Sequence, residues 1–116
     1  MIKLVGLKNC DTCRKAKKWL EAEGFTYAFH DVRGDGLSAE DVSGWAAKLG
    51  WEALLNHRGT TWRGLSEEQK ADVDEAKAIA LIVESPALMK RPVFVSGNEV
   101  ILGFKQDQMD ALHALK

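Results

Sequence analysis

The sequence predicts one α/β domain built on a mixed four-stranded sheet. The chain is short, at 116 residues, and its two ends carry different patterns around a helical middle. The first residues read as strand, helix, strand, and the last residues as strand, strand, helix. We therefore expect residues 1–33 and 86–116 to form the core of the domain, and about 34–85 to form a helical insertion.

The amino-terminal part has the pattern of a βαβ unit. Residues 2–7 form a short apolar, β-branched run that is typical of a buried strand. A helical pattern begins at Thr12, and Gly24 suits its carboxyl end. The apolar face of that helix is expected to contain Ala16, Trp19 and Leu20. Residues 25–31 alternate with a period of two, so a right-handed crossover would make the two strands parallel neighbours.

The middle of the chain is predicted to be helical. Ser38 and Asp41 approximate a capping box, and Gly50 ends the helix that follows. Its buried face is expected to contain Val42, Trp45, Ala46 and Leu49. A loop spans residues 56–63, and Ser66 with Gln69 forms a second capping box. A further helix over residues 74–84 is expected to bury Ala76, Ile79, Ala80 and Val83.

The carboxyl-terminal part predicts two strands and a helix. Pro86 ends the preceding helix, and Val93–Val95 reads as a strand. Gly97 and Asn98 turn the chain into a partner strand over Glu99–Leu102. A final helix over residues 107–115 is expected to face inward with Leu112 and Leu115.

Composition and charge exclude several classes of protein. Sixteen Lys and Arg balance seventeen Asp and Glu, which gives no support for broad nucleic-acid binding. The amino terminus is too short for the apolar region of a signal peptide, and no apolar run is long enough to span a bilayer. We therefore expect a cytoplasmic protein without a membrane partner. In such a setting two cysteines are reactive or metal-binding more often than they are a structural disulfide.

Cys10-Asp11-Thr12-Cys13 stands where the first strand passes into the first helix. Free backbone N–H groups and the positive end of the helix favour an anion there, which lowers the pKa of the first thiol. Cys10 is therefore the candidate nucleophile, and Cys13 is placed to resolve a mixed disulfide. Lys8, Arg14 and Lys17 would add positive potential.

The cysteine pair is also compatible with other roles. A zinc site would need two further ligands, but the chain has no third cysteine, and its three histidines are scattered. No metal is therefore expected. The cysteines could also form a structural disulfide or be ordinary buried thiols, and Thr12 could either donate a hydrogen bond to the thiolate or help to cap the helix.

The whole chain resembles the ArsC/Spx family of thioredoxin-like proteins, which includes the arsenate reductases coupled to glutaredoxin. The resemblance is carried by residues 9–15, by Arg58, and by the segment 86–92. Residues 50–56 and 58–63 look closest to the YffB branch of the family. The resemblance implies a thioredoxin-like fold.

The resemblance also implies roles for individual residues. Cys10 matches the cysteine that attacks arsenate in the reductases, and Arg14 matches an arginine four positions after it. Arg58 and Arg91 match two arginines that hold the oxyanion or a glutathione adduct, a task that suits the paired donors of a guanidinium group. Pro92 is the candidate for the cis-proline that thioredoxin-like folds place beside the reactive cysteine.

The sequence departs from the arsenate reductases at three places. It lacks their histidine before the cysteine, it has Lys105 near the position of their third arginine, and Cys13 adds a second cysteine. The resemblance thus implies a thiol-dependent reductase acting on a small oxyanion or a disulfide. It implies no tightly bound cofactor, with glutathione as cosubstrate and glutaredoxin or thioredoxin as reductant. The alternative is a redox-sensing regulator of the Spx type that binds RNA polymerase.

Overall fold

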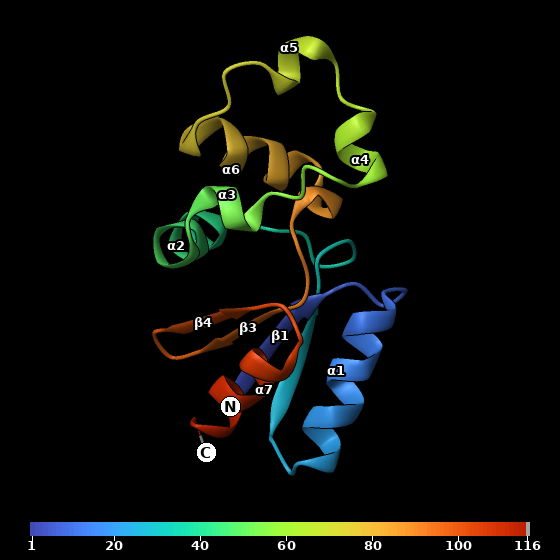
Figure 1. Cartoon of the computed structure of the whole chain (residues 1–116), viewed down its shortest axis with the longest axis vertical. Coiled ribbons are helices and arrows are strands. Elements are labelled where there is room, and N and C mark those ends of the chain that lie inside the picture. Colours follow the sequence, from blue (N-terminus) through green and yellow to red (C-terminus); the bar gives the residue numbers. More distant parts are fainter. Residues whose placement is uncertain (116) are drawn as a thin grey trace. The chain divides into compact units, whose positions relative to one another are not determined.

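The computed structural model describes residues 1–115, and these fall into two compact units. The first unit consists of residues 1–35 and the segment from Arg91 onward, and the second consists of residues 36–90. Figure 1 shows the order of the elements along the chain. Each unit is described separately below.

The first unit begins with the predicted βαβ arrangement. Strand β1 (Ile2–Gly6) leads into helix α1 (Asp11–Ala22), and strand β2 (Tyr27–Asp31) follows. β1 and β2 are parallel, in register from the pair Ile2 and Tyr27 to the pair Gly6 and Asp31. Gly24 follows α1 with a φ of +78°, a conformation that glycine adopts without steric cost. The helix buries Cys13, Ala16 and Leu20.

The same unit ends with two strands and a helix. Strand β3 (Val93–Ser96) and strand β4 (Glu99–Leu102) form an antiparallel hairpin that turns at Gly97, and helix α7 (Gln106–His113) follows. β3 also pairs antiparallel with β1, so the sheet has the order β2-β1-β3-β4. The prediction of an α/β, thioredoxin-like fold with a mixed four-stranded sheet is confirmed.

The core of the first unit joins the sheet to both of its helices. Its buried side chains are Ile2, Leu4, Ala16, Leu20, Phe94 and Leu112. Trp19 packs against this core and stacks on Phe25 at 5.6 Å and on His113 at 5.2 Å between ring centroids. His113 Nε2 also lies 2.6 Å from Glu23 Oε1. These contacts attach α7 to the carboxyl end of α1.

The second unit contains helices joined by turns and loops, and its one β contact is an isolated bridge between Leu55 and Met89. It contains α2 (Ala39–Leu49), α3 (Trp51–Leu54), α4 (Thr60–Arg63), α5 (Glu67–Lys70), α6 (Glu75–Glu84) and the 3-10 helix η1 (Pro86–Leu88). The predicted caps are present, because Ser38 accepts a hydrogen bond from the Asp41 N–H and Ser66 forms a complete capping box with Gln69. The prediction of a helical middle is confirmed.

Some local predictions are wrong. The expected loop over residues 56–63 contains α4, whose first residue follows Gly59 without a side-chain cap. In α6 the buried side chains are Ala78, Leu81 and Ile82, whereas Ala76 and Ala80 of the predicted face are exposed. Residues 76–83 are apolar on nearly every side except at Lys77, so periodicity did not select the correct face.

The end of the chain also differs from the prediction. Leu112 is buried, but Leu115 is 37% exposed because α7 already ends at His113. Lys116 lies outside the described residues. No helix among residues 1–115 has the length and apolar character needed to cross a membrane. The cytoplasmic location and the lack of a nucleic-acid partner stay predictions.

Candidate active site at Cys10

Three connections of the first unit meet at one edge of the sheet. Because β1 and β2 are parallel and Gly6 pairs with Asp31, the loops that follow the two strands start side by side. β3 runs the opposite way and pairs Val93 with Val5, so the residues just before β3 lie at the same edge. The carboxyl ends of parallel strands are the usual place for ligand sites in open α/β sheets.

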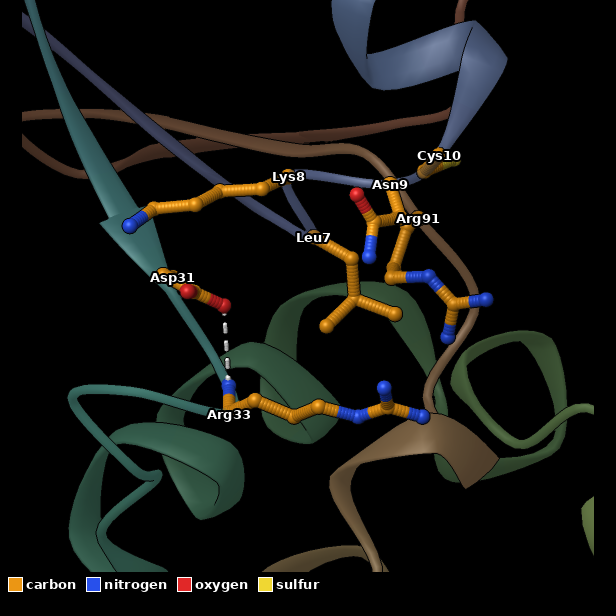
Figure 2. Close-up of a pocket in the computed structure, with 7 residues that line it drawn as sticks. All are labelled: Leu7, Lys8, Asn9, Cys10, Asp31, Arg33 and Arg91. Carbon is orange, nitrogen blue, oxygen red and sulfur yellow. Dashed lines mark hydrogen bonds between the residues drawn. The ribbon is translucent and has the colours of Figure 1, made fainter.

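A cavity of about 350 Å³ lies at this edge. The loop after β1 contributes Leu7, Lys8, Asn9 and Cys10, the loop after β2 contributes Asp31 and Arg33, and the segment before β3 contributes Arg91. Figure 2 shows these side chains, with Cys10 at one end of the set and Arg33 at the other. The cavity therefore combines a partly exposed thiol with three cationic side chains and one carboxylate.

Cys10 is the residue that precedes the first turn of α1, with φ −97° and ψ 121°. Partial burial by itself raises the pKa of this thiol, but four interactions outweigh it. They are the backbone N–H of Cys13, the Cys13 side chain, the positive charge of Arg91 and the backbone N–H of Thr12. The net result is a pKa below the ordinary value of a cysteine, as the position at the start of a helix predicts.

Cys13 behaves in the opposite way. It is 1% exposed, and burial raises the pKa of its thiol to about 11, with a further contribution from its hydrogen bond to Cys10 and from the charge of that residue. Contacts with the backbone of Leu7 and with Arg91 act against this rise. Of the two thiols Cys10 therefore ionises first, and the Cys13 thiol then donates a hydrogen bond to the Cys10 thiolate.

Gly6 makes room for the Cys13 sulfur. A Cβ atom at position 6 would lie 2.5 Å from Cys13 Sγ and 3.4 Å from Cys13 Cβ. Gly6 belongs to the central strand β1 and Cys13 to the first turn of α1, so neither the strand nor the helix can move away freely from the other. The close approach of strand and helix that sets the position of both thiols thus requires glycine at this position.

Arg91 and Pro92 adjoin the cysteine pair. The Arg91–Pro92 peptide bond is cis, and Pro92 is buried. Arg91 lines the cavity, and its charge lowers the pKa of both thiols. Of the predicted site residues, the fold therefore brings Cys10, Cys13 and Arg91 together, and Pro92 connects Arg91 to β3.

Two other basic residues of α1 have partners of their own. Arg14 forms an ion pair with Asp11, and both side chains are well exposed. The Lys17 ammonium lies 4.0 Å from the centroid of the Phe29 ring. Arg14 and Lys17 are not among the residues that line the cavity, whereas Lys8 is.

Arg58 belongs to the second unit, where both its backbone N–H and its carbonyl oxygen are hydrogen-bonded to nearby side chains. Its N–H donates to Asn56 Oδ1 at 3.0 Å, and its carbonyl oxygen accepts from Arg63 Nη2 at 2.9 Å. The ring of His57 contacts that of Trp62 edge to face at 4.8 Å between centroids. The Arg58 side chain is exposed.

Sequence reasoning missed Asn9, Asp31 and Arg33 as parts of the cavity. The parallel pairing of the first two strands could have predicted that these residues belong to the cavity, because the loops that follow two parallel strands lie at the same edge of the sheet. In the described part of the chain, no three His, Cys, Asp or Glu side chains are grouped so as to hold a metal ion.

Comparison with known proteins assigns the chain to a family. The sequence model of the ArsC family matches residues 5–112. An uncharacterized protein of Haemophilus influenzae is 38% identical over 98% of this chain and 100% of its own length. A solved structure named YffB protein is 45% identical, with a TM-score of 0.91, over 96% of this chain and 97% of its own. An arsenate reductase (ArsC) related protein from Brucella melitensis is 41% identical, with a TM-score of 0.76, over 97% of this chain and 93% of its own. The chain therefore belongs to the ArsC family and is related to arsenate reductases.

Proposed function

We propose that the protein is a thiol-dependent reductase in which Cys10 is the nucleophile. The observation that supports this most directly is the lowered pKa of Cys10 in an open cavity beside Arg91. A thiolate is the reactive form of cysteine, and a lowered pKa raises its fraction at neutral pH. The substrate is a small oxyanion or a disulfide, and the family relation makes arsenate the first oxyanion to test.

With a disulfide, the Cys10 thiolate attacks one sulfur, a bond from Cys10 to that sulfur forms, and the other half of the substrate leaves as a thiolate. The thiolate of Cys13 or of glutathione then attacks the Cys10 sulfur and releases the second half. The final disulfide takes two electrons from glutaredoxin or thioredoxin, which restores the Cys10 thiolate. No bound metal or cofactor enters this sequence.

With arsenate, Cys10 forms a bond to arsenic and displaces a hydroxide ion, which leaves as water after protonation. Attack of a second thiolate on the Cys10 sulfur breaks the sulfur–arsenic bond, and arsenic keeps the electron pair and leaves as arsenite. Arg91 is the cavity residue suited to hold the negative oxygens, since its guanidinium offers paired donors. The resemblance to arsenate reductases assigns the same task to Arg58.

The test is the pH dependence of Cys10 alkylation by iodoacetamide, followed by mass spectrometry. Wild type and Cys13→Ser should both react with an apparent pKa well below the ~8.5 of a free thiol, because a serine hydroxyl still donates to the thiolate. Cys13→Ala removes that donor and should show a higher pKa. Cys10→Ser is the control and should incorporate no label at the native site.

The second stage uses glutathione disulfide and arsenate with reduced glutathione and glutaredoxin. We expect a glutathione adduct on Cys10 or a Cys10–Cys13 disulfide, and turnover of at least one substrate. An unshifted pKa, or a Cys10 thiol that reacts only after denaturation, would contradict the reductase and would favour the redox-sensing regulator that binds RNA polymerase.

A further inference from the structure

Helix α1 carries a basic face close to the reactive thiol. Arg14, Lys15 and Lys18 are exposed, and their spacing of three and four residues places Lys18 one turn after the other two on the solvent side of the helix. The opposite side of α1 buries its apolar residues and Cys13. The basic face, formed by Arg14, Lys15 and Lys18, therefore begins about one turn beyond Cys10, the residue that precedes the helix.

The stability of the helix does not explain why these cations are grouped. Like charges three or four residues apart on a helix repel each other, and Lys18 stands in that relation to both Lys15 and Arg14. The dipole of a helix favours cations in the last turn, but the last turn of α1 contains Glu21 and no basic residue. A cluster that breaks two local preferences without a gain in stability is typical of a functional surface.

Most of this positive charge is not neutralised within residues 1–115. One of the three cations is paired, with Asp11. In that part of the chain no salt bridge joins Lys15 or Lys18 to a carboxylate. Glu21 lies three residues after Lys18, but its carboxylate is hydrogen-bonded to Tyr27, and burial together with this carboxylate raises the pKa of the Tyr27 hydroxyl. Two ammonium groups of the basic face are therefore left to bind an external anion.

A partner that fits this face is anionic and has business with Cys10. The proposed thiol chemistry needs a reductant whose thiol reaches the Cys10 sulfur. A protein that docks on the basic face brings its surface to the start of α1, where Cys10 is only partly buried. Acidic side chains around the partner's thiol would match the basic face, and opposite charges speed such docking. Nucleic acids and lipid surfaces are also anionic, but they carry no thiol.

We propose that the basic face of α1 is the docking surface for a dithiol protein whose reactive thiol is surrounded by acidic side chains. This inference rests on the proposed reductase function and adds the surface that its reductant uses. When Cys10 is held in a disulfide, a thiolate of the partner forms a bond to the Cys10 sulfur, and the group bound there leaves as a thiolate. The partner's second thiolate then attacks the partner sulfur of this mixed disulfide. Cys10 leaves as a thiolate, and the partner becomes a disulfide that has given up two electrons.

Thiol peptides of different charge test the docking surface. Cys10 is first converted into a mixed disulfide with the chromophore thionitrobenzoate, in a Cys13→Ser background that prevents attack from within the protein. Three capped peptides of equal length each carry one central cysteine, flanked by glutamates, glutamines or lysines. Attack of a peptide thiolate on the Cys10 sulfur releases thionitrobenzoate, and its absorbance gives the second-order rate. The rate of the glutamate peptide should fall most steeply as the salt concentration rises.

A double variant and a matched control separate the surface from net charge. Lys15→Gln combined with Lys18→Gln should slow the glutamate peptide by roughly three- to tenfold, the range of two exposed ion pairs. The same double variant should speed the lysine peptide and leave the glutamine peptide unchanged. Glutamine forms helices about as well as lysine, so α1 is kept. The control Lys48→Glu changes the net charge by the same amount at an exposed position of α2 and should change none of the rates.

The decisive result is the rate of the glutamate peptide in the double variant and in the control. A rate that the double variant leaves unchanged, or that Lys48→Glu lowers equally, would overturn the docking surface and leave the reductase intact. If even the glutamine peptide fails to react at Cys10, the reductase is refuted, and the docking surface with it. Binding of a single-stranded oligonucleotide that is lost in the double variant, with the glutamate peptide unaffected, would overturn the protein partner in favour of a nucleic acid.

Discussion

The contact between Gly6 and Cys13 predicts that one added methyl group destabilises the fold. In Gly6→Ala the new Cβ would lie 2.5 Å from Cys13 Sγ, well inside a normal contact distance. Overpacking of this kind costs about 1–3 kcal/mol, while replacing glycine by alanine in a strand returns about 0.4–1 kcal/mol through the unfolded chain. We expect Gly6→Ala to lower the free energy of unfolding by about 1–2 kcal/mol, the difference between these two effects.

Cys13→Ala supplies the partner for a double-mutant cycle. Alone it removes a buried sulfur and should cost about 1 kcal/mol, similar to one buried methylene group. With the sulfur gone, the nearest Cys13 atom to the new methyl is Cβ at 3.4 Å, which is tolerable. The double variant should therefore be no less stable than Cys13→Ala. Urea unfolding followed by tryptophan fluorescence measures all four proteins, and costs that simply add would refute the steric argument.

Three further predictions concern charge. Arg91→Met should raise the apparent pKa of Cys10 in the alkylation assay, because Arg91 is the charged side chain that lowers it, and an unchanged pKa would contradict that assignment. Cys13 has a folded pKa of about 11, above its unfolded value, so its thiol stabilises the fold below pH 9 and this contribution is lost as the pH rises toward 11. Unfolding curves should show wild type losing roughly 2 kcal/mol more than Cys13→Ala across that window, and parallel curves would refute the shift. Glu23→Gln should lower the free energy of unfolding by less than about 1 kcal/mol in thermal unfolding, because the contact of Glu23 with His113 is partly exposed. A loss of several kcal/mol would mean that the ion pair, and not the stacking on Trp19, holds α7 in place.

Much of the fold could be predicted because its signals are local. β-branched runs mark the strands, and the start of α1 places Cys10 at a helix end whatever the rest of the chain does. The face of α6 could not be predicted, because an apolar sequence on nearly all sides leaves the choice to tertiary packing. Helix α4 could not be predicted either, because no side chain caps its amino-terminal end.

Only part of the candidate site could be predicted from the sequence, because the rest of it depends on tertiary structure. The cysteine pair is a contiguous motif, but Arg33 and Asp31 reach the cavity through the register that pairs Gly6 with Asp31. A sequence pattern predicts that two strands are parallel without specifying which residues lie opposite each other. Gly6 itself carries no signal in the sequence, since the need for glycine arises from the approach of α1 to β1.

The lack of space around Cys13 has a consequence for oxidative damage. Cysteine sulfur that is oxidised beyond the sulfenic acid gains further oxygen atoms and is no longer restored by thiols. At Cys13 the strand already excludes a methyl group on the Gly6 side, and the residue is 1% exposed, so peroxide has neither access nor room there. Direct oxidation by peroxide is therefore directed to Cys10, and the Cys13 thiol is left to condense with a Cys10 sulfenic acid into a disulfide, a form that thiols reduce again.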